Sequence, residues 1–328
     1  MVADVESDEQ GYCVVIDLPT PAYPDTDRLR EAVVKAAQDA GLPADRVRVR
    51  FVSNVRGRNS GGRIGLRVRN VIAVGSGKGG VGKSTVAAAV AFGLKHFGAK
   101  VGLMDADVYG PSIPHLIGAG GRPQIVERRT EDGRVLQRLV PIEHDGLKVI
   151  SIGFMINEDQ PVIWRGPMLH KLLTQFLQDT EWGELDYLII DLPPGTGDVS
   201  LTLSQLLGLA GAVVVCTPQK VALLDAVKAL KMFHQVKIPV LGVVENMTGD
   251  VFGRGGAKRL AEKEGVPFLG EIPCEPVIRE LADEGRIADL IATDNPARDA
   301  VLQVARGVAM QIAREYVAQP QMPVLEIL

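Results

Sequence analysis

From about residue 70 onward, short apolar runs alternate with longer segments in which apolar residues recur at helical spacing. The apolar runs carry almost no charge, which is typical of parallel strands buried on both faces. They cover residues 71–74, 101–104, 147–152, 187–190, 212–216, 240–244 and 268–272. The helical segments cover residues 84–97, 168–178, 199–207, 221–234, 257–264 and 296–317. This alternation predicts an α/β fold whose mostly parallel sheet has helices on both faces.

The beginning of the chain has a different pattern. A short apolar run at Val14–Ile16, a helical segment at 28–39 and an alternating basic and apolar stretch at 46–52 follow one another. Together they predict a small α+β module over residues 1–56.

Residues 57–69 are rich in glycine and arginine, which predicts a basic flexible linker. The linker is either simply solvated or a docking site for an anionic partner. The main domain is then expected over residues 70–318, and prolines set off a tail at 319–328.

Composition and charge exclude several classes of protein. The chain has 328 residues, of which 46% are hydrophobic and 23% charged, and a formal net charge of −4. This balance gives no reason to expect nucleic-acid binding. No apolar run reaches the roughly 18 residues that span a membrane, and the acidic start is unlike a secretory signal. We therefore expect a cytoplasmic protein that binds neither nucleic acid nor membrane.

Cysteine and histidine are sparse. The three cysteines are Cys13, Cys216 and Cys274, and no Cys-x-x-Cys pair occurs. The five histidines show no metal-ligand spacing. The sequence therefore predicts neither a disulfide framework nor a zinc site.

A glycine-rich loop follows the first apolar run and precedes the first helical segment. It comprises Gly77, Lys78, Gly79, Gly80, Val81, Gly82, Lys83, Ser84 and Thr85. Glycines let backbone N–H groups approach a phosphate, and the start of the helix adds a positive dipole end. Lys83 is expected to reach the β- and γ-phosphates, Ser84 to ligate Mg²⁺ and Thr85 to hold the α-phosphate. The alternative, a glycine-rich turn with a chance Lys-Ser, does not explain the strand–loop–helix context. The sequence therefore predicts an ATP site with Mg²⁺.

Three aspartates end apolar runs that belong to the predicted sheet. Asp105 and Asp107 follow the run at 101–104, and Asp191 ends the run at 187–190. Ligand sites of parallel sheets lie at the carboxyl ends of strands, so Asp105 and Asp191 are expected on the magnesium side. Asp105 and Asp107 could instead only cap the following turn. After Asp191, Gly195 and Thr196 could sense the γ-phosphate.

Lys78, directly after the first glycine, resembles the deviant phosphate loop of the MinD/ParA/nitrogenase-iron-protein class of ATPases. The resemblance implies a homodimer in which Lys78 crosses to the nucleotide of the partner subunit. There it would neutralise transition-state charge much as an arginine finger does. It also implies that Asp107 orients the attacking water.

Five longer segments make the resemblance more specific. They are Asp105–Ser112, Trp164–Met168, Asp191–Asp198, Glu245–Met247 and Gly253–Ala257, and over about 70–315 they resemble the Mrp/ApbC family of iron–sulfur cluster carriers.

The resemblance also implies contacts and partners. Asn246 would read the adenine amino group, and the loop from Pro273 to Pro276 would flank the base. The implied partners are iron–sulfur apo-proteins or assembly factors. The N-terminal module resembles the second half of a domain that precedes this ATPase in the family.

The chain departs from this family at the cluster ligands. The family carries a Cys-x-x-Cys after the Glu-Asn-Met segment, where this chain continues without cysteine from Met247 to Gly253. Four thiolates are the common ligand set of such clusters. Cys216 lies in an apolar run and is interpreted as a core residue, and Cys274 lies near the expected adenine loop. An iron–sulfur cluster is therefore implied by the family but lacks its usual ligands here.

Three functions remain open. The chain could be an ATP-driven iron–sulfur assembly or carrier factor, or a nucleotide-switched adaptor that has lost cluster binding. It could also be a positioning ATPase like MinD or ParA. The helix expected at 300–317 has only Arg306 and Arg314 as cations, which argues against a membrane-surface helix.

Overall fold

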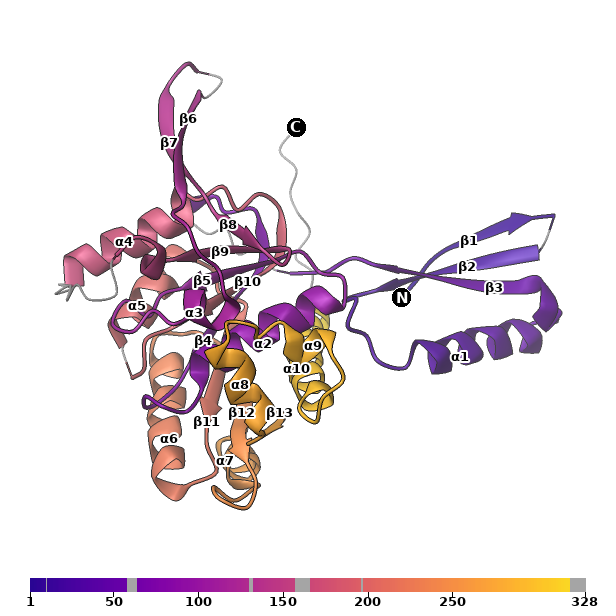
Figure 1. The fold of residues 1–328 in the computed structure, drawn as a ribbon. Helices are drawn as coiled ribbons and strands as arrows, with labels where there is room; N and C mark the ends of the chain where they lie inside the picture. The colour runs from indigo at the N-terminus through magenta and orange to yellow at the C-terminus, as the bar shows by residue number, and fades with distance from the viewer. Residues whose placement is uncertain (10, 58–63, 130–131, 157–165, 196, 319–328) are drawn as a thin grey trace. The chain divides into compact units, whose positions relative to one another are not determined.

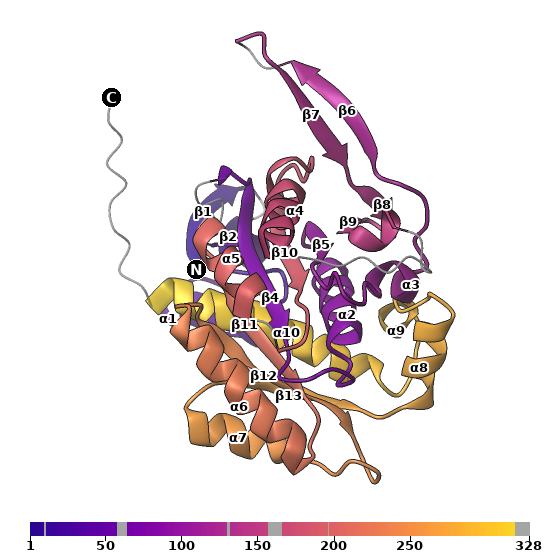
Figure 2. The same ribbon diagram turned by 90° about the vertical axis from the view of Figure 1, so that its left-hand side faces the viewer.

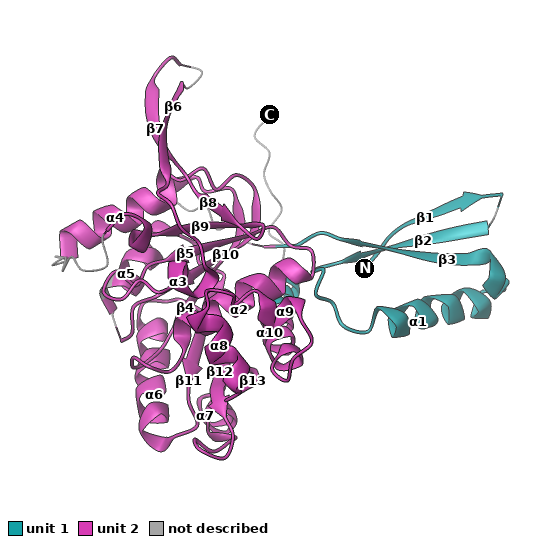
Figure 3. Ribbon diagram, viewed as in Figure 1, with its two compact units in different colours: residues 1–56, 309–328 teal, residues 57–308 magenta. Residues whose placement is uncertain are grey.

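The structure is a computed structural model that describes residues 1–9, 11–57, 64–129, 132–156, 166–195 and 197–318. Four parts of the sequence predictions lie outside these residues: linker residues 58–63, Trp164 with Arg165, Thr196, and the tail 319–328. The chain forms two compact units (Figure 3). One combines Met1–Arg56 with Ala309–Leu328, and the other is Gly57–Val308.

The larger unit is built on an eight-stranded sheet with the order β13-β12-β11-β4-β10-β5-β9-β8. Neighbouring strands are parallel except β8, which is antiparallel to β9. The strands are β4 (Val68–Gly75), β5 (Val101–Asp105), β8 (Ile142–His144), β9 (Leu147–Ser151), β10 (Leu185–Asp191), β11 (Gly211–Cys216), β12 (Val240–Thr248) and β13 (Phe268–Pro273). The predicted α/β architecture is confirmed, although β4 begins inside the stretch predicted as linker.

Helices cover both faces of this sheet (Figure 2). One face carries α4 (Gly166–Gln178), α5 (Gly197–Leu206), α6 (Lys220–Gln235) and α7 (Gly256–Glu264). The other carries α2 (Lys83–His96), α3 (Ile113–Ile117), α8 (Pro276–Asp283), α9 (Asp289–Ala292) and α10 (Arg298–Ala318).

Alternate residues of each strand face opposite sides of the sheet and pack into the hydrophobic core on that side. Val71 and Ala73 of β4 pack in a cluster with apolar residues of α4, α5, α6 and α7. Trp182 is fully buried in this cluster and donates its indole N–H to the carbonyl of Phe176. Such two-sided burial fixes the strand register, because a slip of one residue would exchange the two faces.

The register places the ends of three central strands at one level. Asp191 of β10 is paired with Val74 of β4 on one side and with Asp105 of β5 on the other. The phosphate loop and both loops that carry the aspartates therefore leave the sheet at the same edge.

A two-stranded ribbon of β6 (Gln124–Arg129) and β7 (Val135–Val140) extends away from this sheet (Figure 1). The ribbon was not predicted from the sequence, because its apolar residues do not form a buried face. Ile125 and Val135, for example, are 67% and 51% exposed. The helices α3 and α9 and the strand β8 were also not predicted, because each is too short to show a period, and α8 was missed as well.

The smaller unit has a three-stranded sheet of β1 (Val2–Asp8), β2 (Gly11–Leu18) and β3 (Val47–Ser53), with α1 (Thr26–Asp39). β1 is antiparallel to β2, and β2 is parallel to β3. The predicted α+β content is present, but β1 was missed because its acidic sequence hides the alternation. Among the described residues, no helix is long and apolar enough to cross a membrane.

A candidate nucleotide site at the carboxyl ends of the strands

The phosphate loop connects β4 to α2 in the way that the motif requires. Gly80 and Gly82 both have φ near 77°, a left-handed conformation that favours glycine. Gly77 is fixed by packing, because a Cβ there would lie 2.0 Å from the carbonyl oxygen of Asp225 in α6. The loop is therefore held tightly between the sheet and α6.

A cavity of about 300 Å³ lies over this loop. Its lining includes Ser76, Lys78, Gly79, Gly80, Gly82, Lys83, Ser84, Thr85, Asp107, Ser112, Leu116 and Pro194. Most of the predicted phosphate-binding residues thus meet in one place, together with Asp107. Ser112, Leu116 and Pro194 were not predicted as site residues, although Ser112 and Pro194 lie within the family segments.

Lys83 is the centre of the charged groups in this site. Its ammonium Nζ lies 2.6 Å from Oδ1 of Asp191, 3.4 Å from Oδ2 of Asp107 and 3.1 Å from Oγ of Ser84. Lys83 is only 7% exposed. In this geometry Lys83 neutralises the carboxylates, and a phosphate group would compete with them for the same ammonium.

Asp191 does not line the cavity, and one of its carboxylate oxygens has no hydrogen-bond partner among the described residues. The residue is completely buried, and Oδ2 accepts no hydrogen bond within the described part of the chain. Burial raises the pKa of Asp191, and the Lys83 ammonium opposes that shift. A buried acceptor without a partner beside the Ser84 hydroxyl fits a hard cation such as Mg²⁺, which prefers oxygen ligands.

Both carboxylate oxygens of Asp105 accept hydrogen bonds from other groups of the protein. Oδ1 accepts the backbone N–H of Asp107, and Oδ2 accepts the N–H of Ile113 and the hydroxyl of Ser151. Burial, with Asp191 nearby, raises the pKa of Asp105 from 3.8 to about 8. Asp105 thus anchors the loop after β5, and its role on the magnesium side stays a prediction.

The loop after β10 contacts the phosphate loop. The N–H of Gly195 donates to the carbonyl of Ser76 at 3.0 Å, and the Ser76 hydroxyl donates to the carbonyl of Lys78. Lys78 is half-buried and makes no ion pair with a described residue. A movement of the backbone at Gly195 would therefore shift the phosphate loop, which carries Lys78.

Asn246 contacts the phosphate loop, but neither Asn246 nor Pro273 lines the cavity. The Asn246 amide donates to the carbonyl of Val81 at 2.9 Å, and Pro273 is paired with Thr248 at the ends of β12 and β13. Their adenine contacts remain a prediction. Next to Asn246, the buried carboxylate of Glu245 accepts the N–H groups of Gly255 and Ala257 at the start of α7, which the sequence analysis did not foresee.

A model of the family described as ParA: NUBPL iron-transfer P-loop NTPase matches residues 67–309. This chain belongs to that family. The family segments quoted from the sequence fall within the matched residues.

Among curated relatives, an "Iron-sulfur cluster carrier protein" of Deinococcus radiodurans is 45% identical over 95% of this chain and 89% of its own. A protein of the same description from Aquifex aeolicus is 52% identical over 73% of this chain and 67% of its own.

Solved structures agree with the fold. A nucleotide-binding protein from Archaeoglobus fulgidus in complex with ADP has a TM-score of 0.58 and 39% identity, over 71% of this chain and 91% of its own. The cell division ATPase MinD of Pyrococcus furiosus has a TM-score of 0.55 over 74% of this chain and 98% of its own, and its 22% identity supports the fold alone.

The cysteines of this family member are separated. Cys216 is buried in β11, and burial raises the pKa of its thiol to about 12, whereas Cys274 is exposed at the end of β13. Cys13 lies in the smaller unit. Among the described residues, no three His, Cys, Asp or Glu side chains gather as a metal site. The interpretation of Cys216 as a core residue is consistent with its burial.

The raised pKa of Asp105 predicts a pH dependence of stability. The folded state binds this proton more tightly than the unfolded chain does, because the pKa is near 8 instead of 3.8. The free energy of unfolding should therefore fall as pH rises from about 4 to about 8. Asp105→Asn should flatten this slope, whatever its effect on stability at one pH. Urea unfolding without nucleotide or divalent cations tests this, and an unchanged slope would contradict it.

Proposed function

We propose that this chain is a homodimeric, cytoplasmic ATPase that assembles or transfers iron–sulfur clusters. The observation that carries the proposal is the 45% identity over 95% of the chain to a protein described as an iron–sulfur cluster carrier. The phosphate loop and aspartates of this chain supply the nucleotide chemistry that such a role needs.

In the proposed ATP complex, Lys83 leaves the carboxylates and binds the β- and γ-phosphates. Ser84 and Oδ2 of Asp191 would hold Mg²⁺, with Asp105 as the supporting carboxylate, and the ion would supply charge neutralisation to the phosphates. Asp107, whose Oδ1 is fixed by the N–H of Gly110, orients the attacking water. Asn246 and Pro273 contact the adenine ring.

Lys78 is proposed to act in the partner's site. It lines the cavity and has no carboxylate partner among the described residues, so its ammonium is available to a second nucleotide. An added cation close to the γ-phosphate stabilises the charge that develops during phosphoryl transfer.

Lys78→Ala should therefore keep ATP binding and lose hydrolysis, whereas Lys83→Ala should lose binding itself. Titration calorimetry and phosphate release measure the two separately. Mixing the Lys78→Ala variant with the Asp107→Ala variant provides the sharper test. In the mixed dimer, the site of the Lys78→Ala subunit keeps its own Asp107 and receives an intact Lys78 from the other subunit. Activity should return on mixing, and two variants that stay inactive together would contradict the action of Lys78 in trans.

The cluster is cargo in this proposal, and the chain supplies few of its ligands. Cys274 is the exposed thiol of the larger unit, and its N–H donates to the carbonyl of Thr248, next to the turn from Gly249 to Gly253. A dimer would bring two copies of Cys274, and the remaining ligands would come from a client protein. Since a cluster commonly needs four thiolates, binding should be weak and reversible.

The second candidate function is a nucleotide-switched adaptor that binds no cluster. The dispersed cysteines and the buried, weakly acidic thiol of Cys216 favour it.

Anaerobic reconstitution with iron and sulfide distinguishes the two functions. We expect bound iron and sulfide that pass to an apo-ferredoxin in the presence of ATP. Cys274→Ser should abolish this transfer, whereas Cys216→Ser, the matched control, should not. A protein that binds ATP but acquires and transfers no iron would rule out the carrier function and favour the adaptor.

A further inference from the structure

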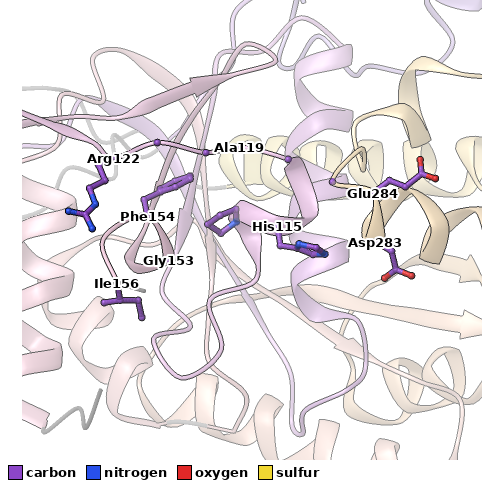
Figure 4. A pocket seen from close by; sticks show the side chains of 13 residues that line it. His115, Ala119, Arg122, Gly153, Phe154, Ile156, Asp283 and Glu284 are labelled. Carbon is purple, nitrogen blue, oxygen red and sulfur yellow. The ribbon is translucent and has the colours of Figure 1, made fainter. Parts of the chain in front are cut away.

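A second cavity, of about 610 Å³, lies in the larger unit next to α3 (Figure 4). Its wall is formed by α3 with the following residues to Arg122, by the turn after β9, and by the end of α8. In Figure 4, Arg122 and Ile156 lie at one end, Phe154 and His115 lie in the middle, and Asp283 and Glu284 lie at the other end. Neither the family match nor the nucleotide chemistry assigns a ligand to it.

Helix α3 separates this cavity from the nucleotide cavity. Ser112 and Leu116 line the nucleotide cavity, whereas Pro114 and His115 line the second one. A ligand in either cavity therefore contacts the same short helix.

Two walls of the second cavity are attached to one carboxylate. Asp105 accepts the N–H of Ile113, where α3 begins, and the hydroxyl of Ser151, which in turn accepts the N–H of Gly153. Gly153 also packs closely on α3, because a Cβ there would lie 3.2 Å from Cγ of Pro114. A shift of the loop after β5 would move both walls together.

The ends of α3 and α8 pack closely against each other. Gly118 and Gly285 end the two helical segments with φ of 68° and 70°, and a Cβ on Gly118 would lie 2.4 Å from the carbonyl oxygen of Gly285. The N–H of Ile287 also donates to the carbonyl of Leu116. The shape of the cavity is therefore set by the close packing of α3 against the end of α8.

The polar groups of this cavity that have no partner in the described part of the chain are donors suited to binding an anion. Arg122 is exposed and has no ion pair or hydrogen bond within the described residues, and the N–H groups of Gly120 and Gly121 have no acceptor there. The carboxylates at the opposite end of the cavity are already paired with cations, since Asp283 pairs with Arg279 and Glu284 pairs with Arg286.

An apolar surface lies beside these donors. Phe154 is 5% exposed and forms part of the wall with the half-buried Ile156. A guanidinium, free backbone N–H groups and an adjacent apolar surface are the features that recognise a terminal carboxylate next to an apolar side chain.

We infer that this cavity binds the C-terminal carboxylate of a partner peptide whose last side chain is apolar. The carboxylate lies on Arg122 and the N–H groups of Gly120 and Gly121, and the side chain lies on Phe154 and Ile156. Because α3 is shared, the peptide binds with different affinity in the ADP and ATP states. This inference concerns a site separate from the proposed cluster chemistry and does not depend on it.

Fluorescence anisotropy with the full chain tests the site. The probe is fluorescein-labelled Gly-Ser-Gly-Ser-Val-Leu with a free carboxyl terminus, and the controls end in an amide or replace the terminal leucine with serine. The free acid should bind at least about tenfold more tightly than the amide, because the amide cannot make a charged bidentate contact with Arg122. Replacing the leucine should also weaken binding.

Arg122→Gln should weaken binding of the free acid at least about tenfold. Arg129→Gln, an exposed arginine of β6 outside the cavity lining, is the matched control and should have no effect. Equal binding of acid and amide, equal effects of the two arginine variants, or no binding of any probe would each overturn the site. ATP binding by every variant confirms that it is folded, so failure here is distinguishable from failure of the nucleotide site.

The nucleotide linkage is tested with the same probe. Its affinity should differ at least about fivefold between the ADP complex and a complex with a non-hydrolysable ATP analogue. Equal affinities in the two complexes would overturn the linkage through α3.

Discussion

The ion pair between Lys83 and Asp191 joins the phosphate loop to the centre of the sheet, and the site is arranged around it. The pair is buried at a distance of 2.6 Å, so removing either charge would leave the other buried without this partner. Buried pairs of this kind contribute little net stability, because both ions lose their hydration. The value of this pair lies in its position. It keeps the ammonium of Lys83 where phosphates bind and keeps Oδ2 of Asp191 available for a metal ion.

The second constraint is the carboxyl of Asp105. It lies beside Asp191 in the sheet register, yet its oxygens accept donors from Asp107, Ile113 and Ser151. Burial raises the pKa of Asp105, and the neighbouring carboxylate of Asp191 adds to this shift, whereas Lys83 opposes the rise that burial causes at Asp191. Asp105 thus connects the nucleotide-binding edge to α3 and to the turn after β9, and so to the second cavity.

The sequence predicts the parts of this site that depend on local spacing. The glycine-rich loop, the strands with two buried faces and the aspartates at their ends could all be found, because strand, turn and helix preferences act over a few residues. The hydrogen-bond and ion-pair partners of each aspartate could not be predicted. Asp105 and Asp191 both end apolar strands, and only the approach of Ser151 and Ile113 to one and of Lys83 to the other separates their roles.

Features that depend on distant contacts were also missed. The ribbon of β6 and β7 has no buried face to reveal its period, and α3 has only five residues. The close packing of Gly118 on Gly285 joins residues far apart in the chain, so no local pattern shows it.

Asp191 is expected to hold Lys83 through Oδ1 while the site is empty and to bind a magnesium ion through Oδ2 in the nucleotide complex. Calorimetric titration with ADP, with and without Mg²⁺, for the wild type and Asp191→Asn measures this claim. The wild type should bind ADP more tightly when Mg²⁺ is present. The variant should bind ADP without Mg²⁺ at least as tightly as the wild type, since Lys83 is no longer held by Asp191, and should gain little from Mg²⁺. A variant that keeps the full enhancement by Mg²⁺ would contradict the account.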